Sequence, residues 1–265
     1  MTDGRPVRSS VYRERNSTAD RALDILGLFA PGRLNISGSQ VAEELSVAKS
    51  TAYRYLQSLT AAHYLEEDPA GGYRLGLKVL ELSRLARASY GLSQVALPVM
   101  RELSRATDET ALLTRRSGAR AVCLEKEEPF EHRVRLSYER GSALPLNAGA
   151  SALVVLAWED ADVVSELLTE SRLQQYTNAT ITSESALVER LAEIRSVGYV
   201  VGRGELDADA IGVAAPIRDD RERVVAGISV VAVRSRIPEA RIPEVVRQVR
   251  DAADRISELV ALTAQ

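Results

Sequence analysis

The spacing of apolar residues in the first third of the chain predicts three short helices. Apolar positions recur at helical spacing over residues 19–29, and Pro31-Gly32 ends that helix. Two more helices are expected over 39–45 and 49–62, with a tight turn between them. Small and apolar residues would let these two helices cross at a steep angle: Ala42, Leu45, Val47, Ala52 and Leu56. This pattern predicts a helix-turn-helix.

A hairpin and two linking helices are expected next. Short strands over 64–67 and 73–75 flank a Pro/Gly turn, which places the hairpin where the wing of a winged helix would lie. Helical patterns then cover 77–88 and 93–106, and Ser89-Tyr90-Gly91 separates them. We expect the domain boundary in this linking segment.

The rest of the chain mixes strand and helix patterns. Strands are predicted over 110–115, 120–126 and 133–139, and helices over 151–158, 162–168 and 185–196. Two nearly continuous apolar runs, 211–217 and 223–233, predict central strands of a sheet that is covered on both faces. The last helix, 239–263, carries an apolar stripe that we expect to pack on this sheet. The order of elements indicates an α+β fold, in which linking helices join the winged helix-turn-helix to a mixed domain.

Composition excludes several classes of protein. The net charge of −3 removes bulk positive charge as an argument for nucleic-acid binding, although residues 1–90 have a small positive excess. Cys123 is the only cysteine, which excludes an internal disulfide framework, and His63 and His132 lack metal-type spacing. The longest apolar run, 224–233, is too short for a membrane helix, and no apolar signal core is present. We therefore expect a cytoplasmic protein with no metal or cofactor.

The first sixteen residues form a basic segment. Residues 1–16 contain four arginines and almost no aliphatic side chains, so we expect them to be disordered in isolation. Two interpretations stay open. The segment is either a basic arm that lies along DNA or a solvated tail.

Several motifs resemble those of the IclR-type bacterial transcriptional regulators. In the N-terminal part they are STAYRYLQSL at 50–59, YLE at 64–66 and YRLGLK at 73–78. Downstream they are LPLNAGAS at 144–151, GY at 198–199, GEL at 204–206, GVAAPI at 212–217 and GISV at 227–230. The resemblance spans residues 18–262 and keeps the order of that family.

The resemblance implies a DNA-binding regulator with a small-molecule effector. It implies a winged helix-turn-helix over 17–78 after the basic arm, linking helices over 79–106 and a GAF-like effector-binding domain over 107–265. It also implies homodimers or dimers of dimers that bind operator DNA, which a two-fold protein would recognise as a (pseudo)palindrome. The sign of regulation does not follow from the sequence, and we prefer a repressor.

The outer face of the predicted helix 49–62, with the wing, carries the DNA-binding candidates. They are Lys49, Ser50, Thr51, Tyr53, Arg54, Gln57 and Arg74. Small residues at the helix start let the backbone approach a phosphate, and Lys49 adds positive charge. Arg54 is long enough to bond a guanine edge through two nitrogens. The wing turn itself is acidic to neutral, so Arg74 is the weaker candidate.

The effector-binding candidates come from positions that match the family's ligand contacts. By resemblance they are Leu136, Leu144, Ala150, Ser151, Gly202, Gly212, Ser229 and Val231, and Arg203 is added as a possible anchor that could equally face solvent. The small residues of the 147–151 loop would expose backbone N–H groups to a carboxylate, or would only permit close helix packing. Asn147 and Leu153 replace the family's usual His and Lys, and Gly202 replaces an acidic residue. We therefore expect a larger, partly apolar or aromatic organic acid.

An enzyme and a pure interaction module are the two functions that compete with a regulator. No G-x-S-x-G frames Ser151 and no P-loop is present, so we expect no enzyme, and we interpret the acidic stretch 205–209 as a solvated loop. Cys123, in a strand pattern, is interpreted as a buried inert thiol. The alternative function is a small-molecule sensor or enzyme with a vestigial DNA-binding domain. A pure interaction module would need an exposed interface. We expect the linking helices, and not the last helix, to form the dimer interface.

Overall fold

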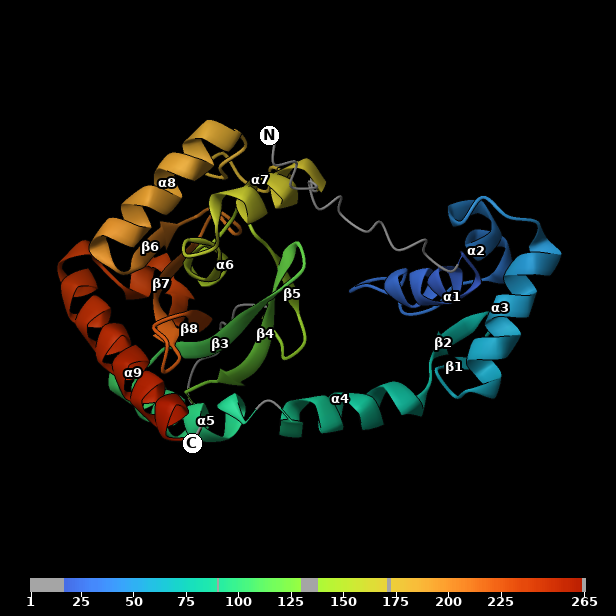
Figure 1. Ribbon diagram of the computed structural model, residues 1–265, viewed down its shortest axis with the longest axis horizontal. Helices are drawn as coiled ribbons and strands as arrows, with labels where there is room; N and C mark the ends of the chain where they lie inside the picture. The colour runs from blue at the N-terminus through green and yellow to red at the C-terminus, as the bar shows by residue number, and fades with distance from the viewer. Residues whose placement is uncertain (1–16, 90, 130–137, 171–172, 264–265) are drawn as a thin grey trace, which may run out of the picture. The chain divides into compact units, whose positions relative to one another are not determined.

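The α+β fold expected from the sequence is confirmed (Figure 1). The computed structural model describes residues 17–89, 91–129, 138–170 and 173–263. The chain divides into two compact units, residues 1–86 and 87–265. In the described part of the chain, no helix combines the length and the apolar character that a membrane crossing would require.

The first unit is a helix-turn-helix followed by a small hairpin. Its elements are α1 (Ser17–Gly27), α2 (Gly38–Glu44), α3 (Lys49–Ala61), β1 (Leu65–Glu67), β2 (Tyr73–Leu75) and α4 (Leu77–Ser89), which runs past the end of the unit. Each helix begins and ends within two residues of its expected bounds. Fully buried side chains from three helices, from the segment before α2 and from the hairpin form the core: Ile25, Ile36, Val41, Leu56 and Leu65. The apolar spacing that predicted the helices therefore also predicted this core.

Local hydrogen bonds explain the sharp turn between α2 and α3. Ser37 caps α2, since its Oγ accepts the Gln40 N–H while the Gln40 side chain accepts the Ser37 N–H. Ser46 adopts a positive φ of 52° after α2. The Val47 N–H then donates to the Ala42 carbonyl at 2.9 Å, and this bond closes the turn. Val47 packs partly buried against the core, in the role expected for it.

The second unit is one antiparallel sheet with helices on both faces. The strands are β3 (Thr110–Ser117), β4 (Arg120–Glu127), β5 (Ala143–Pro145), β6 (Val200–Arg203), β7 (Ala210–Arg218) and β8 (Val224–Val233). Their spatial order is β5-β4-β3-β8-β7-β6. The helices are α5 (Leu92–Thr107), α6 (Ala150–Leu156), α7 (Ala161–Glu170), α8 (Glu184–Val197), the 3₁₀ turns η1 (Arg234–Arg236) and η2 (Glu239–Arg241), and α9 (Ile242–Thr263).

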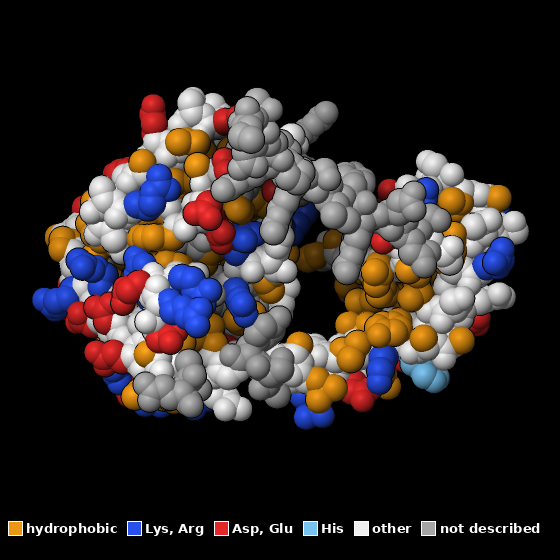
Figure 2. Space-filling model, in the orientation of Figure 1, with side chains coloured by type: hydrophobic (Ala, Val, Ile, Leu, Met, Phe, Trp, Pro, Cys, Tyr) orange, Lys and Arg blue, Asp and Glu red, His pale blue; other side chains and the backbone are white. Residues whose placement is uncertain are grey.

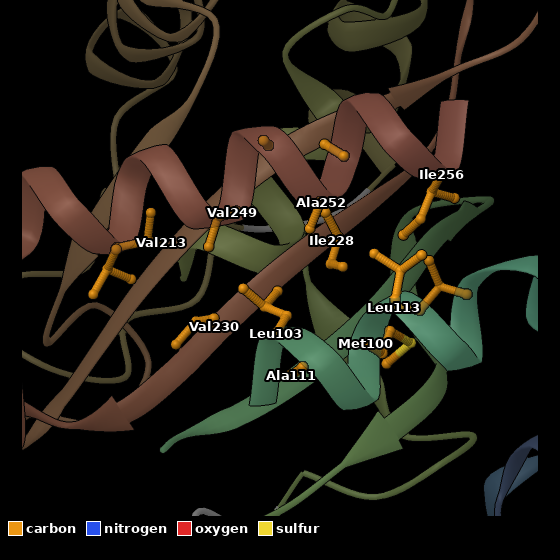
Figure 3. Close-up of a cluster of buried hydrophobic side chains, with 14 of the residues drawn as sticks. Met100, Leu103, Ala111, Leu113, Val213, Ile228, Val230, Val249, Ala252 and Ile256 are labelled. Carbon is orange, nitrogen blue, oxygen red and sulfur yellow. The ribbon is translucent and has the colours of Figure 1, made fainter. Parts of the chain in front are cut away.

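Helices α5 and α9 cover one face of this sheet. Met100 of α5 and Val249 and Ile256 of α9 point towards Leu113 and Ile228 on the strands (Figure 3). The apolar stripe of α9 is buried here, which confirms that it packs on its own sheet. Burial of this kind contributes roughly 25 cal/mol per Å² of apolar surface, so the contact is a main source of stability for the unit.

Helix α6 covers the other face and is buried at all seven positions. It approaches β8 closely because Gly227 lies beneath it, where a Cβ would collide with Val154 Cγ1. The central strands β7 and β8 are thus covered on both faces, as their continuous apolar runs predicted.

Two edge strands were not expected from the sequence. β5 and β6 are three and four residues long, and β6 contains Gly202 and Arg203, so neither carries a clear alternating pattern. The last helix begins at Ile242, after η2, and not at residue 239. Residues 133–137 of the predicted strand 133–139 lie outside the described residues, as does the basic arm 1–16. Residues 138–139 are described and are not part of a strand.

Candidate nucleic-acid interface and effector pocket

Helix α3 presents a polar face opposite its buried face. Ala52, Leu56 and Leu59 are buried against the core, which fixes how the helix is turned. The opposite side chains are exposed: Lys49, Ser50, Tyr53, Arg54 and Gln57; Thr51 is half-buried. Among the described residues, no acidic side chain forms an ion pair with Lys49 or Arg54. Both cations therefore remain available to a phosphate or a base edge.

Tyr53 is packed against the start of α2. A Cβ on Gly38 would lie 2.6 Å from the Tyr53 ring. The Tyr53 residue is nevertheless 44 % exposed. Its ring is therefore oriented by the contact with α2 and is still accessible to solvent. This contact positions Tyr53 on the same surface as Arg54.

The hairpin is less basic than a DNA-binding wing usually is. Arg74 of β2 pairs with Glu66 of β1 at 3.3 Å. Glu66 also accepts the Leu77 N–H at the start of α4. At the turn, Asp68 accepts the Ala70 N–H, which lowers the pKa of this carboxyl group below its usual value. Arg74 is thus partly neutralised, in line with its expected weaker role.

The second unit contains a small cavity where the 147–151 loop meets the sheet. Its volume is about 30 Å³, room for a few water molecules. Six of the nine effector candidates line it: Leu144, Ala150, Ser151, Gly202, Gly212 and Val231. The lining residues that the sequence did not single out are Tyr138, Ala148, Gly149, Gly204, Glu205, Leu206, Asp207, Ala210 and Ile211.

The two strand glycines let α6 approach the sheet. A Cβ on Gly212 would lie 3.0 Å from the Ala150 Cβ, and a Cβ on Gly202 would lie 3.0 Å from the Ala150 nitrogen. Larger side chains at either position would push the loop away or fill the cavity. These glycines therefore shape the pocket through close packing.

The remaining three effector candidates do not line the cavity in the described structure. Ser229 is fully buried behind the wall, and its hydroxyl bonds to that of Ser151 at 2.7 Å. Arg203 points outwards and pairs with Glu239 at 2.9 Å, which further raises the pKa of its guanidinium. Leu136 lies outside the described residues.

Glu205 is the functional candidate that the sequence interpretation missed. Its Oε2 accepts the Gly149 N–H at 2.7 Å, so the carboxylate lies where an effector carboxylate was expected. Burial raises the pKa of Glu205, while the Gly149 N–H and the charge of Arg190 oppose that shift. Asp207 to Asp209 are exposed, as expected for a solvated loop, but that interpretation is wrong for Glu205. The sequence offered two signals for Glu205, the GEL motif and the acidic stretch 205–209, and neither indicated its contact with Gly149.

Asn147 has a structural contact that the sequence did not indicate. Its side-chain amide is buried and donates to the carbonyls of Gln174 and Ile181, at 3.0 and 2.8 Å. Thr177 and Thr180 of the same segment donate to the carbonyls of Gly204 and Glu205. The 174–181 segment thus joins the 147–151 loop to Glu205. Asn147 does not line the cavity.

Cys123 lies in the interior of the second unit. Cys123 is fully buried, and this desolvation raises the pKa of the thiol to about 12. The expected burial of the thiol is confirmed, and its raised pKa disfavours the reactive thiolate form. Within the described ranges, no group of three or more His, Cys, Asp or Glu side chains is arranged to hold a metal ion.

Comparison with known proteins decides the family. The model of the bacterial transcriptional regulator IclR C-terminal domain matches residues 86–258, and that of the IclR helix-turn-helix domain matches residues 18–69. The chain belongs to the IclR family. It is a transcriptional regulator with a helix-turn-helix DNA-binding domain and an IclR effector domain.

Relatives of this IclR-family regulator share nearly its full length. It is 30 % identical to the HTH-type transcriptional regulator KipR of Bacillus subtilis, over 95 % of this chain and 100 % of KipR. It is 29 % identical to the HTH-type transcriptional repressor AllR of Escherichia coli, over 98 % and 97 % of the two chains. An IclR homologue of Microbacterium hydrocarbonoxydans, solved in complex with 4-hydroxybenzoate, superposes with a TM-score of 0.76 at 28 % identity, over 94 % and 100 % of the chains.

Proposed function

We propose that this regulator is a cytoplasmic repressor that reads a (pseudo)palindromic operator through α3 and responds to an aromatic or partly apolar organic acid. The observation that carries the proposal is the exposed face of α3, on which Arg54 has no acidic partner among the described residues. The name of the relative AllR supports a repressor, and no group for catalysis was identified in the sequence.

The exposed face divides into two kinds of DNA contact. Lys49, Ser50 and Thr51 lie at the start of α3 and are assigned to phosphates. Arg54, one turn further along, is assigned to a guanine edge, with Tyr53 and Gln57 beside it. Arg74 is assigned to the backbone, where its pairing with Glu66 reduces its contribution.

A homodimer would cover the apolar surface of α4. Leu77 and Leu80 are 71 % and 68 % exposed, and Leu85 is 47 % exposed. Hydrophobic side chains are visible on this part of the surface in Figure 2. Clustered exposed leucines indicate an interface, and a two-fold operator requires two reading helices. Dimers could pair further into tetramers.

The cavity beside α6 is assigned to the effector. Its apolar walls, from Leu144, Ile211 and Val231, suit a ring, while the Ser151 hydroxyl supplies one polar contact. A homologue bound to 4-hydroxybenzoate supports this class of ligand. A ring is larger than a cavity of about 30 Å³, so we expect binding to widen the pocket. Widening would alter the dimer and its affinity for the operator.

Footprinting on the protein's own upstream DNA tests the proposal. We expect a protected two-fold site that persists between about 50 and about 200 mM salt, whereas non-specific binding falls steeply over that range. Arg54→Ala should lose about 1–3 kcal/mol at its cognate base. Arg84→Ala removes the same charge from the exposed surface of α4 and is the control. Absence of any binding at low salt would contradict DNA binding and favour a sensor with a vestigial DNA-binding domain.

A further inference from the structure

The charge of the effector pocket does not suit an acid. Glu205 and Asp207 line the cavity, whereas none of its described lining residues is Lys, Arg or His. An organic acid that enters as an anion would meet the half-buried carboxylate of Glu205 and the exposed carboxylate of Asp207. Like charges at close range in such a site cannot both remain ionised without a large cost.

Glu205 cannot easily move away from an incoming acid. Thr180 Oγ1 donates to the Glu205 carbonyl at 2.6 Å, and Thr177 Oγ1 donates to the Gly204 carbonyl at 2.5 Å. The side chain is fixed in turn by the Gly149 N–H at 2.7 Å. A Cβ on Gly202 would lie 3.1 Å from Glu205 Oε2, so the carboxylate also lies close to β6. The backbone carbonyl and the side-chain carboxylate of Glu205 are therefore both held in place by hydrogen bonds at the wall of the cavity.

The charged groups around Glu205 leave its carboxylate without an ion pair among the described residues. Arg190 of α8 donates instead to Glu193 and to the Val201 carbonyl. The side chain of Arg203 of β6 pairs with Glu239, although the backbone N–H and the charge of Arg203 also act to lower the pKa of Glu205. Asp207, on the same loop as Glu205, adds negative charge, and the remaining titratable group at the cavity is the Tyr138 phenol, whose pKa burial raises to about 12. Burial of Glu205 is thus only partly compensated, and its pKa is raised.

We propose that Glu205 couples effector binding to proton uptake. This inference rests on the proposed acid effector. One proton from solvent enters with the ligand and is held between the ligand carboxylate and the Glu205 carboxylate, so the pair carries one negative charge and not two. No other bond is made or broken, and no oxidant or co-reactant is involved.

Proton coupling has a defined signature. Affinity for the acid should fall by up to about tenfold per pH unit as Glu205 becomes ionised in the free protein. Replacing Glu205 by Gln keeps the size and the carbonyl acceptor for the Gly149 N–H but removes the charge. The Glu205→Gln protein should therefore bind the acid more tightly at neutral pH and with little dependence on pH.

Isothermal titration calorimetry of the full chain with 4-hydroxybenzoate tests the inference. Titrations in two buffers of different ionisation enthalpy, repeated from about pH 5.5 to about pH 8, report the number of protons taken up. We expect uptake approaching one proton in the wild type and none in Glu205→Gln. Glu189→Gln removes an exposed carboxylate of α8 outside the pocket and should behave as the wild type. The neutral analogue 4-hydroxybenzamide should bind without proton uptake.

Each outcome separates this inference from the proposed function. Binding of the acid by the wild type without proton uptake would overturn the coupling and leave the regulator unaffected. Binding of the acid by Glu205→Gln alone, with none by the wild type from about pH 5.5 to about pH 8, would overturn the coupling, because the carboxylate would then exclude the anion without taking up a proton. Failure of the acid to bind either protein at any pH, while both retain operator binding, would overturn the coupling and the acid class together but not the DNA-binding function. If Glu205→Gln does not fold, the proton count of the wild type decides alone.

Discussion

The hydroxyl groups of Ser151 and Ser229 share a hydrogen bond of 2.7 Å that joins the buried helix α6 to the central strand β8. Thr114 of β3 donates to the Ser151 carbonyl at 2.9 Å, so a second bond joins the same residue to the neighbouring strand. Ser151 lines the cavity and Ser229 lies behind it. The position of one pocket wall therefore depends on polar contacts inside the core.

Ser229→Ala should destabilise the protein by about 1–3 kcal/mol, because it leaves the buried Ser151 hydroxyl without that partner. The double variant Ser151→Ala/Ser229→Ala should cost less than the sum of the two single variants, since neither hydroxyl is then left unpaired. Urea denaturation measures all three. Ser165→Ala, on the exposed surface of α7, should change stability by less than about 0.5 kcal/mol. Strictly additive effects would mean that the two hydroxyls are not coupled.

Gly38→Ala should weaken operator binding with little loss of stability. The added methyl group would collide with the Tyr53 ring, but the ring is partly exposed and can swing outwards. Alanine also has the better helix propensity, by about 1 kcal/mol. Tyr53→Phe removes only the hydroxyl group and keeps the ring in place. Comparing it with Gly38→Ala shows whether operator affinity depends on the hydroxyl group or on the position of the ring. Operator affinity and melting temperature should be measured on both, and an unchanged affinity in Gly38→Ala would remove Tyr53 from the DNA contacts.

Arg236→Ala should be strongly destabilising. Glu109 is 1 % exposed and receives two nitrogens of Arg236, with the shortest distance 2.8 Å. Removing one partner of a buried charge pair costs about 3–5 kcal/mol, because the buried charge of Glu109 loses the stabilisation that Arg236 provides. Arg255→Ala breaks the Arg255–Glu102 pair, which is more than half exposed on both sides, and should cost no more than about 1 kcal/mol. Similar costs for the two variants, measured by chemical denaturation, would contradict the role of burial.

The stability of the free protein should depend on the ionisation of Glu205. Its pKa is raised on folding above the ordinary value of 4.5, so the folded state binds the proton more tightly than the unfolded state. The resulting stabilisation is fully present below the pKa that Glu205 has in the unfolded state. It is lost as pH rises through the pKa that Glu205 has in the folded state. The free energy of unfolding of the wild type relative to Glu205→Gln should therefore decrease between about pH 4 and about pH 7. A relative gain with rising pH would show that hydrogen bonds to the carboxylate outweigh burial.

Local pattern was enough to predict the elements of the first unit and most of the second. The helices of the helix-turn-helix follow from apolar residues at helical spacing, and the central strands β7 and β8 from continuous apolar runs. These signals are local, because a helix or a buried strand must direct an apolar face to one side whatever it packs against. The helical spacing of apolar residues also predicted which side of α3 is exposed, and Arg54 lies on that side.

The effector pocket depended on contacts between distant residues. Glu205 meets Gly149 across 56 positions of the chain, and Asn147 meets Ile181 across 34. Arg203 turns outwards because Glu239, 36 positions away, offers it a partner. The short edge strands β5 and β6 likewise exist through pairing with β4 and β7. The sequence by itself determined the family and the elements other than the edge strands, since both are encoded in local order along the chain. Only the tertiary structure decided which polar side chains meet at the cavity, because hydrogen bonds and burial between distant segments leave no periodic signal.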